Sequence, residues 1–167
     1  MRPINLKHFK EEISLIRDIF NESWKDNWGY VPFTEEEFQE LGNNLRYLVS
    51  PEFIQIAEVD GEPAAFMVVL PNINEALIGL NGKLFPFGWL KLLWRLKVRF
   101  PKSARVPLMG VRPKFQQSRL GPALAFLVIN ASREPVQKRG ANLVELSWIL
   151  EDNAGMRNIL EAINCEI

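Results

Sequence analysis

The sequence predicts one domain of the α/β (α+β) class, in which a mixed, mostly antiparallel sheet is flanked by helices. Two amphipathic helical patterns open the chain, two β-rich runs joined by a tight turn follow, and the carboxy-terminal part alternates strand, helix, strand and helix. A tight turn makes its two strands antiparallel, whereas a strand–helix–strand crossover makes them parallel. Both kinds of pairing are therefore expected in one sheet.

Length and composition fit one soluble domain with a core of its own. The chain has 167 residues, of which 47% are hydrophobic. It contains no apolar run of the roughly 18 residues that a membrane span requires. Residues 1–20 lack a signal-peptide pattern, the lone Cys165 cannot build a disulfide framework, and no Cys/His cluster suggests a metal. We expect a cytoplasmic protein.

The amino-terminal third predicts two amphipathic helices. Apolar residues at three- and four-residue spacing mark the first, from about Lys10 to Lys25: Ile13, Ile16, Ile19, Phe20 and Trp24. The second follows Thr34, which forms a predicted capping box with Glu37, and it stops before Pro51. Its expected buried stripe consists of Phe38, Leu41, Leu45 and Leu48.

The middle of the chain predicts a hairpin followed by a less regular segment. Phe53–Val59 and Pro63–Leu70 are β-rich runs joined by Asp60-Gly61, a strong hairpin signal. From Trp89 to Phe100 the chain is apolar with four interspersed cations, which predicts a short amphipathic helix. Such a helix either touches a membrane or a partner, or covers the sheet, and we expect it to cover the sheet.

A strand, a loop and a helix follow in that order. Val106–Val111 reads as a strand, a basic and turn-prone loop comes next, and a helix is predicted over Leu120–Arg133. The loop amides and the helix amino terminus converge on one spot, where amides without intrahelical partners favour an anion. A strand over Leu143–Leu150 and a helix ending at Ile163 complete the chain.

The segment VRPKFQQSRLGPAL, from Val111 to Leu124, carries a family signature. It resembles the acyl-CoA loop of the GNAT superfamily of N-acetyltransferases, V-x-P-x-[YF]-[RQ]-x-x-G-x-G/A-x-x-L. Asn153, after the last strand, matches a second GNAT motif, and the order of elements is the GNAT order. The resemblance implies that fold, with two parallel strands that splay apart around the ligand.

Several positions depart from the family pattern. Arg119 stands where the first glycine of the loop belongs, and Pro122 follows the second. In the last helix Met156 takes the alanine position and Leu160 that of a tyrosine. Asn164 replaces a glycine, and both residue types tolerate a left-handed helix end.

The resemblance implies acetyl-CoA as the acyl donor. The residues that it assigns to the cofactor are Met109, Gly110, Val111, Gln116, Gln117, Ser118, Arg119, Leu120, Gly121, Pro122 and Asn153. Backbone amides at Gly110 or Val111 would polarise the thioester carbonyl. Asn153 would hydrogen-bond the pantetheine arm, and capping the last helix is a compatible second role.

Catalytic and acceptor-binding candidates come from two other segments. Strand alternation puts Glu145 and Ser147 on one face, so Glu145 is a candidate base, with an ordinary exposed strand glutamate as the alternative. In the GNAT fold the loop between the first two helices flanks the acceptor groove, which makes Asn27, Trp28 and Tyr30 candidates for acceptor binding. Packing of Trp28 and Tyr30 is the alternative.

The charges are unevenly distributed although they sum to zero. Residues 76–133, called the acid-free block below, contain no acid. Their basic residues are Lys83, Lys91, Arg95, Lys97, Arg99, Lys102, Arg105, Arg112, Lys114, Arg119 and Arg133. Such a block would attract a polyanion such as CoA, or it forms a solvated basic face.

Two functions remain open from the sequence. The first is an acetyltransferase that acylates a small-molecule amine, and the second is a degenerate GNAT-like module that binds a ligand or partner without chemistry. We expect no nucleic-acid partner, because acids elsewhere cancel the basic charge, and no membrane partner.

Several segments, among them Pro71–Leu84, also resemble the carboxy-terminal half of an uncharacterised bacterial family with tandem GNAT-like domains. In that family the chain continues past Cys165 into one more strand. The last edge strand is therefore expected to be missing here. An exposed sheet edge of this kind would favour a homodimer.

Overall fold

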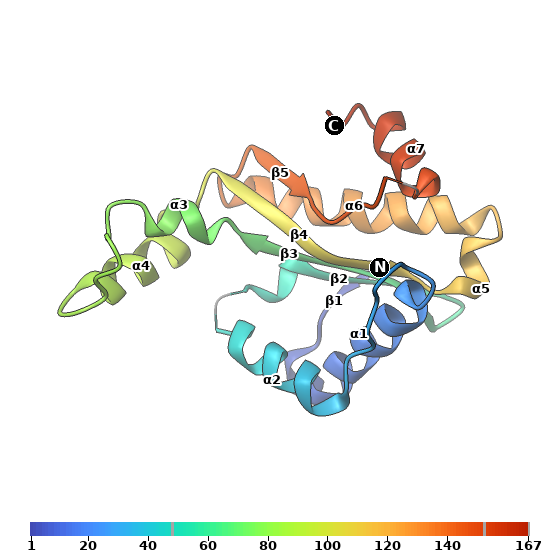
Figure 1. Ribbon diagram of the computed structural model, residues 1–167, viewed down its shortest axis with the longest axis horizontal. Coiled ribbons are helices and arrows are strands. Elements are labelled where there is room, and N and C mark those ends of the chain that lie inside the picture. The colour runs from blue at the N-terminus through green and yellow to red at the C-terminus, as the bar shows by residue number, and fades with distance from the viewer. Residues whose placement is uncertain (48, 152, 167) are drawn as a thin grey trace.

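A mixed sheet organises the protein (Figure 1). The computed structural model describes residues 1–47, 49–151 and 153–166, and within them the sheet has five strands in the order β1-β2-β3-β4-β5. The strands are β1 (Arg2–Pro3), β2 (Ile54–Val59), β3 (Glu62–Pro71), β4 (Ser103–Val111) and β5 (Leu143–Leu146). Neighbours from β1 to β4 are antiparallel, and β4 and β5 are parallel. The predicted fold class is confirmed.

Helices cover both faces of this sheet (Figure 1). On one face lie α1 (Phe9–Trp24) and α2 (Glu35–Leu45), and on the other lies α6 (Leu120–Lys138). The shorter helices are α3 (Ile73–Leu77), α4 (Gly88–Lys97), α5 (Pro113–Gln116) and α7 (Ala154–Ala162), with 3-10 turns at Leu6–His8 and Pro51–Phe53. The element order expected from the sequence is therefore present, with β1, α3 and α5 added.

The central strand β3 explains why two cores form. Residues from Ala64 to Val69 are all buried, because helices cover both faces. Successive strand residues point to opposite faces, so Phe66 and Val68 join the core under α1 and α2, whereas Met67 and Val69 join the core under α6. The apolar stripe predicted for α1 is confirmed in the first core, which contains Ile13, Ile16, Ile19 and Phe20.

Local signals in the sequence predicted the ends of several elements. Thr34 accepts the N–H of Glu37, and the Glu37 carboxylate accepts the N–H of Thr34, which confirms the capping box of α2. Asp60 and Gly61 have φ values of 52° and 81°, as a tight hairpin turn requires. Asn164 has φ 57° after α7, which confirms the left-handed helix end. The predicted contact of Leu48 lies outside the described residues.

Three sequence-based expectations are wrong. Helix α6 does not stop at Arg133 but continues through Pro135 to Lys138, where buried Val136 anchors its last turn. Strand β5 ends at Leu146 and not at Leu150, because the chain turns away from β4 at that point. Helix α4 does not cover the sheet. It packs against α3, and the two extend from one end of the sheet as an arm (Figure 1).

Candidate functional site

The parallel strands β4 and β5 separate halfway along β4. They pair from Ser103 and Leu143 to Val106 and Leu146. Ser147 marks the end of the pairing: its N–H makes the last hydrogen bond to β4, to the carbonyl oxygen of Val106 at 3.3 Å, and its hydroxyl donates to the same oxygen at 3.0 Å. From that point β4 continues to Val111 without β5 beside it. The predicted splay is therefore present, and it leaves one edge of β4 open.

A bulge in β4 lies where the separation begins. Between the pairs Val68–Leu108 and Leu70–Arg105, β4 has one residue more than β3. Pro107 lies in this interval and has no N–H to donate to a ladder, which favours a bulge at this point. The bulge turns the backbone of the following residues, so that the open edge of β4 lines a cavity.

A cavity of about 500 Å³ occupies the splay. It lies between the ends of β4 and β5, the carboxy-terminal end of α1, the start of α6 and the start of α7. Its lining residues are Ser23, Trp24, Asp26, Asn27, Val106, Pro107, Met109, Gly110, Val111, Gln116, Gly121, Pro122, Ala125, Leu146, Ser147, Trp148, Ile149, Leu150, Asn153, Gly155, Met156 and Ile159. The structure thus brings together predicted residues from the cofactor, catalytic and acceptor groups.

Backbone polar groups of β4 face this cavity. The N–H of Arg112 donates to Ala64 on the β3 side at 2.8 Å. Because strand residues alternate in direction, the N–H groups of Val111 and Met109 are directed to the opposite, open edge. The indole N–H of Trp24 donates to the carbonyl oxygen of Met109 at 2.9 Å, which confirms that the polar groups of Met109 face this side.

Two glycines in the cavity wall are required by close approach. A Cβ on Gly121 would lie 2.8 Å from the carbonyl oxygen of Gln116, so glycine lets α6 start directly against α5. A Cβ on Gly110 would lie 2.4 Å from the hydroxyl of Ser23 and 2.9 Å from the ring of Phe66. Gly121, which the resemblance matched, and Gly110 of β4 therefore both allow the backbone to line the cavity.

The loop from Gln116 to Gly121 is held by its own hydrogen bonds. Ser118 accepts the N–H of Leu120 on its hydroxyl at 3.1 Å and the N–H of Gly121 on its carbonyl at 3.2 Å. The N–H of Gln117 donates to Phe115. Arg119 has φ −60°, so a residue with a side chain replaces the family glycine here without a left-handed backbone.

The cations beside the cavity differ in their partners. Arg112 pairs with Glu22 of α1 and donates to the carbonyl oxygen of Pro63 at 2.9 Å. Lys114 pairs with Glu62, and this pairing lowers the pKa of the Glu62 carboxyl. Arg119 is exposed, does not line the cavity, and makes no ion pair within the part of the chain that the structure describes.

The two catalytic candidates are separated by the fold. Ser147 lines the cavity. Glu145 does not line it, and its carboxylate accepts a hydrogen bond from Arg105 at 2.6 Å on the exposed surface, which lowers its pKa. Glu145 lies within β5, opposite Arg105 of β4, whereas Ser147 follows the last paired residue, Leu146. An exposed, paired glutamate is poorly placed to act as the base.

The acceptor candidates are separated in the same way. Asn27 lines the cavity, whereas Trp28 is 92% exposed and does not. Tyr30 packs edge-on against Phe20 at 5.8 Å and donates its hydroxyl to Asn21, and burial raises its pKa. The packing alternative therefore describes Tyr30.

Asn153 occupies the position that the family motif indicated. Its side-chain oxygen accepts the N–H of Met156 at 3.0 Å and so caps α7, as predicted. Asn153 also lines the cavity. The cap uses only the side-chain oxygen of Asn153, so the N–H groups of its amide are not needed for capping. Capping and ligand binding are therefore geometrically compatible.

Among the cavity residues that the sequence did not assign to the site, Trp24, Trp148 and Asp26 are the most informative. Trp24 reads as part of an apolar helix stripe, and nothing local indicates its contact with Met109, which lies 85 residues away. Trp148 has φ 67°, an unusual conformation for a bulky residue that is often found at functional sites. Asp26 is the carboxylate that lines the cavity among the described residues, and an acid in a loop carries no sequence signal of its own.

Helix length and the grouping of possible metal ligands also bear on the type of site. None of the helices that the structure describes is both long and apolar enough to span a membrane. Within the described ranges, no three side chains of His, Cys, Asp or Glu are grouped as metal ligands.

Comparisons with known proteins give relatives that are longer than this chain. No known family profile matches it. It is 57% identical to protein YghO of Escherichia coli over 166 residues, covering 99% of this chain and 43% of that protein. It is 45% identical to a bacterial ceramide synthase of Caulobacter vibrioides over 163 residues, covering 98% of this chain and 42% of that protein. The chain thus spans less than half the length of these relatives.

Solved structures with the same architecture are acetyltransferases. A ribosomal-protein-alanine N-acetyltransferase from Brucella melitensis matches with a TM-score of 0.64 and 12% identity, over 99% of this chain and 85% of that one. A GNAT family acetyltransferase from the same organism, solved in complex with acetyl-CoA, matches with a TM-score of 0.60 and 14% identity, over 99% of this chain and 81% of that one. The chain therefore has the fold of the GNAT acetyltransferases.

Proposed function

We propose that the protein is an N-acyltransferase that moves an acyl group, in the first instance acetyl, from coenzyme A to a primary amine. The observation that carries this proposal is the splay of β4 and β5, which leaves the backbone edge of β4 facing a cavity of about 500 Å³. A thioester carbonyl lying along that edge would meet backbone donors that are already oriented. Proteins with this fold have been solved with acetyl-CoA, which supports the choice of donor.

The residues around the splay have separate tasks in this proposal. The N–H groups of Met109 and Val111 polarise the thioester carbonyl. Asn153 donates its amide N–H to the pantetheine arm while its oxygen caps α7. The exposed Arg119, at the start of α6, clamps a phosphate of coenzyme A, because no carboxylate among the described residues competes for its guanidinium.

Asp26 replaces Glu145 as the proposed base. Acyl transfer forms a C–N bond and breaks the C–S bond, so the amine must lose a proton and the thiolate must gain one. A carboxylate that lines the cavity can take the ammonium proton directly or through water, whereas Glu145 is tied to Arg105 outside the cavity. Leu160, at the family tyrosine position, is buried and has no ionisable group, so the thiolate is protonated by solvent.

The relatives suggest which amines to test. A ceramide is the amide of a long-chain amino alcohol, so the name of the Caulobacter relative indicates acyl transfer to a lipid amine in that protein. We propose small polar amines and a long-chain amino alcohol as the two acceptor classes. Pairing of two copies through the β5 edge stays a prediction, which sedimentation can test.

The experiment is a thiol-release assay with acetyl-CoA, and then with longer acyl-CoA donors, over a panel of both amine classes. We expect amine-dependent release of coenzyme A, reduced about a hundredfold in Asp26→Asn and little changed in Glu145→Gln. A reduction confined to Glu145→Gln would restore Glu145 as the base. Binding of acetyl-CoA without release for any amine would favour the degenerate binding module.

A further inference from the structure

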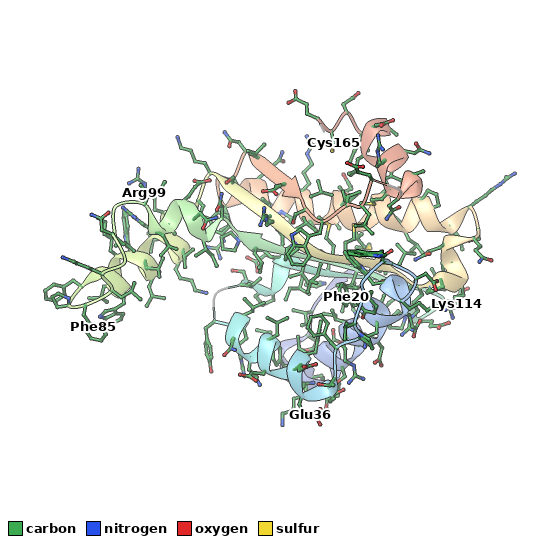
Figure 2. The ribbon with its side chains drawn as sticks, in the orientation of Figure 1. Phe20, Glu36, Phe85, Arg99, Lys114 and Cys165 are labelled. Carbon is green, nitrogen blue, oxygen red and sulfur yellow. The ribbon has the colours of Figure 1, made fainter. Side chains whose placement is uncertain are left out.

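An arm projects from one end of the sheet, beyond the helices that cover the sheet faces. It comprises residues 72–102 and contains α3 and α4 (Figure 1). Figure 2 shows Phe85 at its tip and Arg99 on its side, both directed away from the rest of the protein. The cavity lies at the other end of β4, beyond the bulge at Pro107. The arm is therefore separate from the proposed catalytic site.

The arm is a built element and not a loose loop. Three of its apolar residues, Ala76, Leu80 and Leu96, are buried. Arg95 of α4 donates to the carbonyl oxygens of Ala76 and Ile78, at 2.7 and 2.5 Å, and so fixes α4 against α3. At the base of the arm, Phe100 packs edge-on against Phe53 at 5.4 Å. The outward side of the arm is thus held in a defined shape.

That outward side is unusually apolar. Along α4, Trp89, Leu90, Leu93 and Trp94 lie on one face, because residues three and four apart share a side of a helix. All four are exposed, and Phe85 at 85% and Phe87 at 71% exposure extend the surface to the tip. A surface of this kind on a folded protein indicates a binding site, since scattered apolar residues do not gather in this way.

Cations border this apolar surface. Lys83, Lys91, Lys97 and Arg99 are exposed, and none of them pairs with an acid within the described residues. The arm carries one acid, Glu75, at its base, where it accepts the N–H groups of Lys102 and Ser103 at 3.0 Å. The surface that points outwards therefore combines large aromatic side chains with uncompensated positive charge.

The chemistry of this surface selects a lipid bilayer over a protein partner. Protein interfaces are enriched in aromatic residues but depleted in lysine, and three of the four bordering cations are lysines. Aromatic and leucine side chains with bordering lysines and arginines are typical of helices that lie in the interfacial region of an anionic membrane. A second copy of this chain would bring like charges together.

We propose that the arm docks the protein on an anionic lipid bilayer. Trp89, Leu93 and Trp94 enter the interfacial region together with the aromatic tip, and Lys91 and Lys97 contact lipid phosphates. The docked protein lies on the membrane and does not span it, in agreement with the length of its helices. This proposal differs from the sequence-based expectation of no membrane partner, and it does not depend on the proposed acyltransferase activity.

The test is flotation of the whole protein with vesicles of phosphatidylcholine and phosphatidylglycerol in a two-to-one ratio. We expect flotation at low salt, with a blue shift of tryptophan emission, and little flotation with phosphatidylcholine alone. The variant Trp89→Gln/Trp94→Gln should lose at least about tenfold in vesicle affinity. Phe126→Gln should bind like the wild type, since Phe126 is as exposed as Trp94, at 49% and 50%, but lies on α6.

Charge is tested with two variants of equal net charge. Lys91→Glu/Lys97→Glu should weaken vesicle binding at least about tenfold, whereas Lys10→Glu/Lys138→Glu, on α1 and α6, should weaken it far less. An equal loss of vesicle binding in both variants would show that only net charge matters, and this would overturn docking through the arm. Absence of flotation overturns the proposal, and if the aromatic substitutions instead abolish a dimer, the surface belongs to a second copy. Vesicle binding without acyl transfer would leave docking intact.

Discussion

The two halves of the acid-free block have opposite electrostatic environments. In the half next to the cavity, Arg105, Arg112 and Lys114 pair with Glu145, Glu22 and Glu62, which come from β5, α1 and β3. In the arm, the outward cations have no acid beside them in the part of the chain that the structure describes. A run of one sign in a sequence therefore predicts a charged surface only where the fold brings no acid from elsewhere.

The difference in ion pairing also predicts different effects of the two groups of cations on stability. The paired cations Arg105, Arg112 and Lys114 join elements that are distant in sequence, so they belong to the folded structure. The exposed cations that border the apolar surface of the arm contact solvent and are available to a partner. Substitutions of the paired cations should therefore change folding, and substitutions of the exposed arm cations should change binding to a surface.

The largest effect is expected at the glycines of the cavity wall. Gly110→Ala and Gly121→Ala should each lower the free energy of unfolding by about 2 kcal/mol, because the new Cβ would lie within 3 Å of neighbouring atoms. Gly155→Ala is the matched control in the same wall, since its Cβ would meet nothing closer than 3.8 Å. Urea denaturation measures all three, and equal stability of the three variants would contradict the close packing.

A smaller effect is expected from Arg112→Ala. The substitution removes the pair with Glu22 and the hydrogen bond to Pro63, and we expect a loss of about 1 kcal/mol in the free energy of unfolding. Lys97→Ala on the arm should change it by less than about 0.5 kcal/mol. Similar losses in both variants would remove the contrast between the two halves.

The smallest effect concerns the junction of the two halves. Hydrogen bonds from the Ser103 hydroxyl and from the N–H groups of Lys102 and Ser103 lower the pKa of Glu75. A lowered pKa stabilises the folded state above the ordinary carboxyl range, and this contribution is lost as the pH falls through the folded pKa. Hydrogen exchange should therefore show the arm loosening at acidic pH.

Glu75→Gln is the control for this transition, because the amide cannot titrate. Its protection factors in the arm, which correct for the intrinsic pH dependence of exchange, should be lower at neutral pH and should no longer fall on acidification. A pH dependence that persists unchanged in Glu75→Gln would assign the transition to another group.

Elements with a local cause could be predicted from the sequence. The capping box at Thr34, the turn at Asp60-Gly61 and the left-handed Asn164 each depend on residues within a few positions of one another. The loop to Gly121 was found through its resemblance to the GNAT acyl-CoA loop, and in the structure this glycine lies against Gln116. The fold was predicted from the local signals together with that resemblance.

Features that depend on distant contacts could not be predicted. Strand β5 separates from β4 after Ser147 makes its two hydrogen bonds to Val106, and the alternation of residues along the sequence does not indicate that point. Glu145 was selected because it alternates with apolar neighbours, but Arg105 on the adjacent strand holds it outside the cavity. Asp26 lines the cavity only because α1 ends beside β4.

The arm was misjudged for a related reason. An apolar helix with cations fits equally a helix that covers a sheet and one that faces a membrane surface. The sheet faces are already covered by α1, α2 and α6, so no face remained for α4. Whether a sheet face is left for α4 to cover depends on where the other helices pack, and this is a property of the whole fold.

Calorimetric titration with acetyl-CoA tests the central claim most directly, namely that the loop end of the acid-free block binds the acyl donor and the arm does not. We expect the wild type and Trp89→Gln/Trp94→Gln to bind equally, and Arg119→Gly to bind more weakly by about 1.5 to 3 kcal/mol, the contribution of a charge-assisted hydrogen bond. Equal or tighter binding by Arg119→Gly would contradict the clamp. No heat from any of the three proteins at millimolar acetyl-CoA would contradict the acyl-CoA site itself.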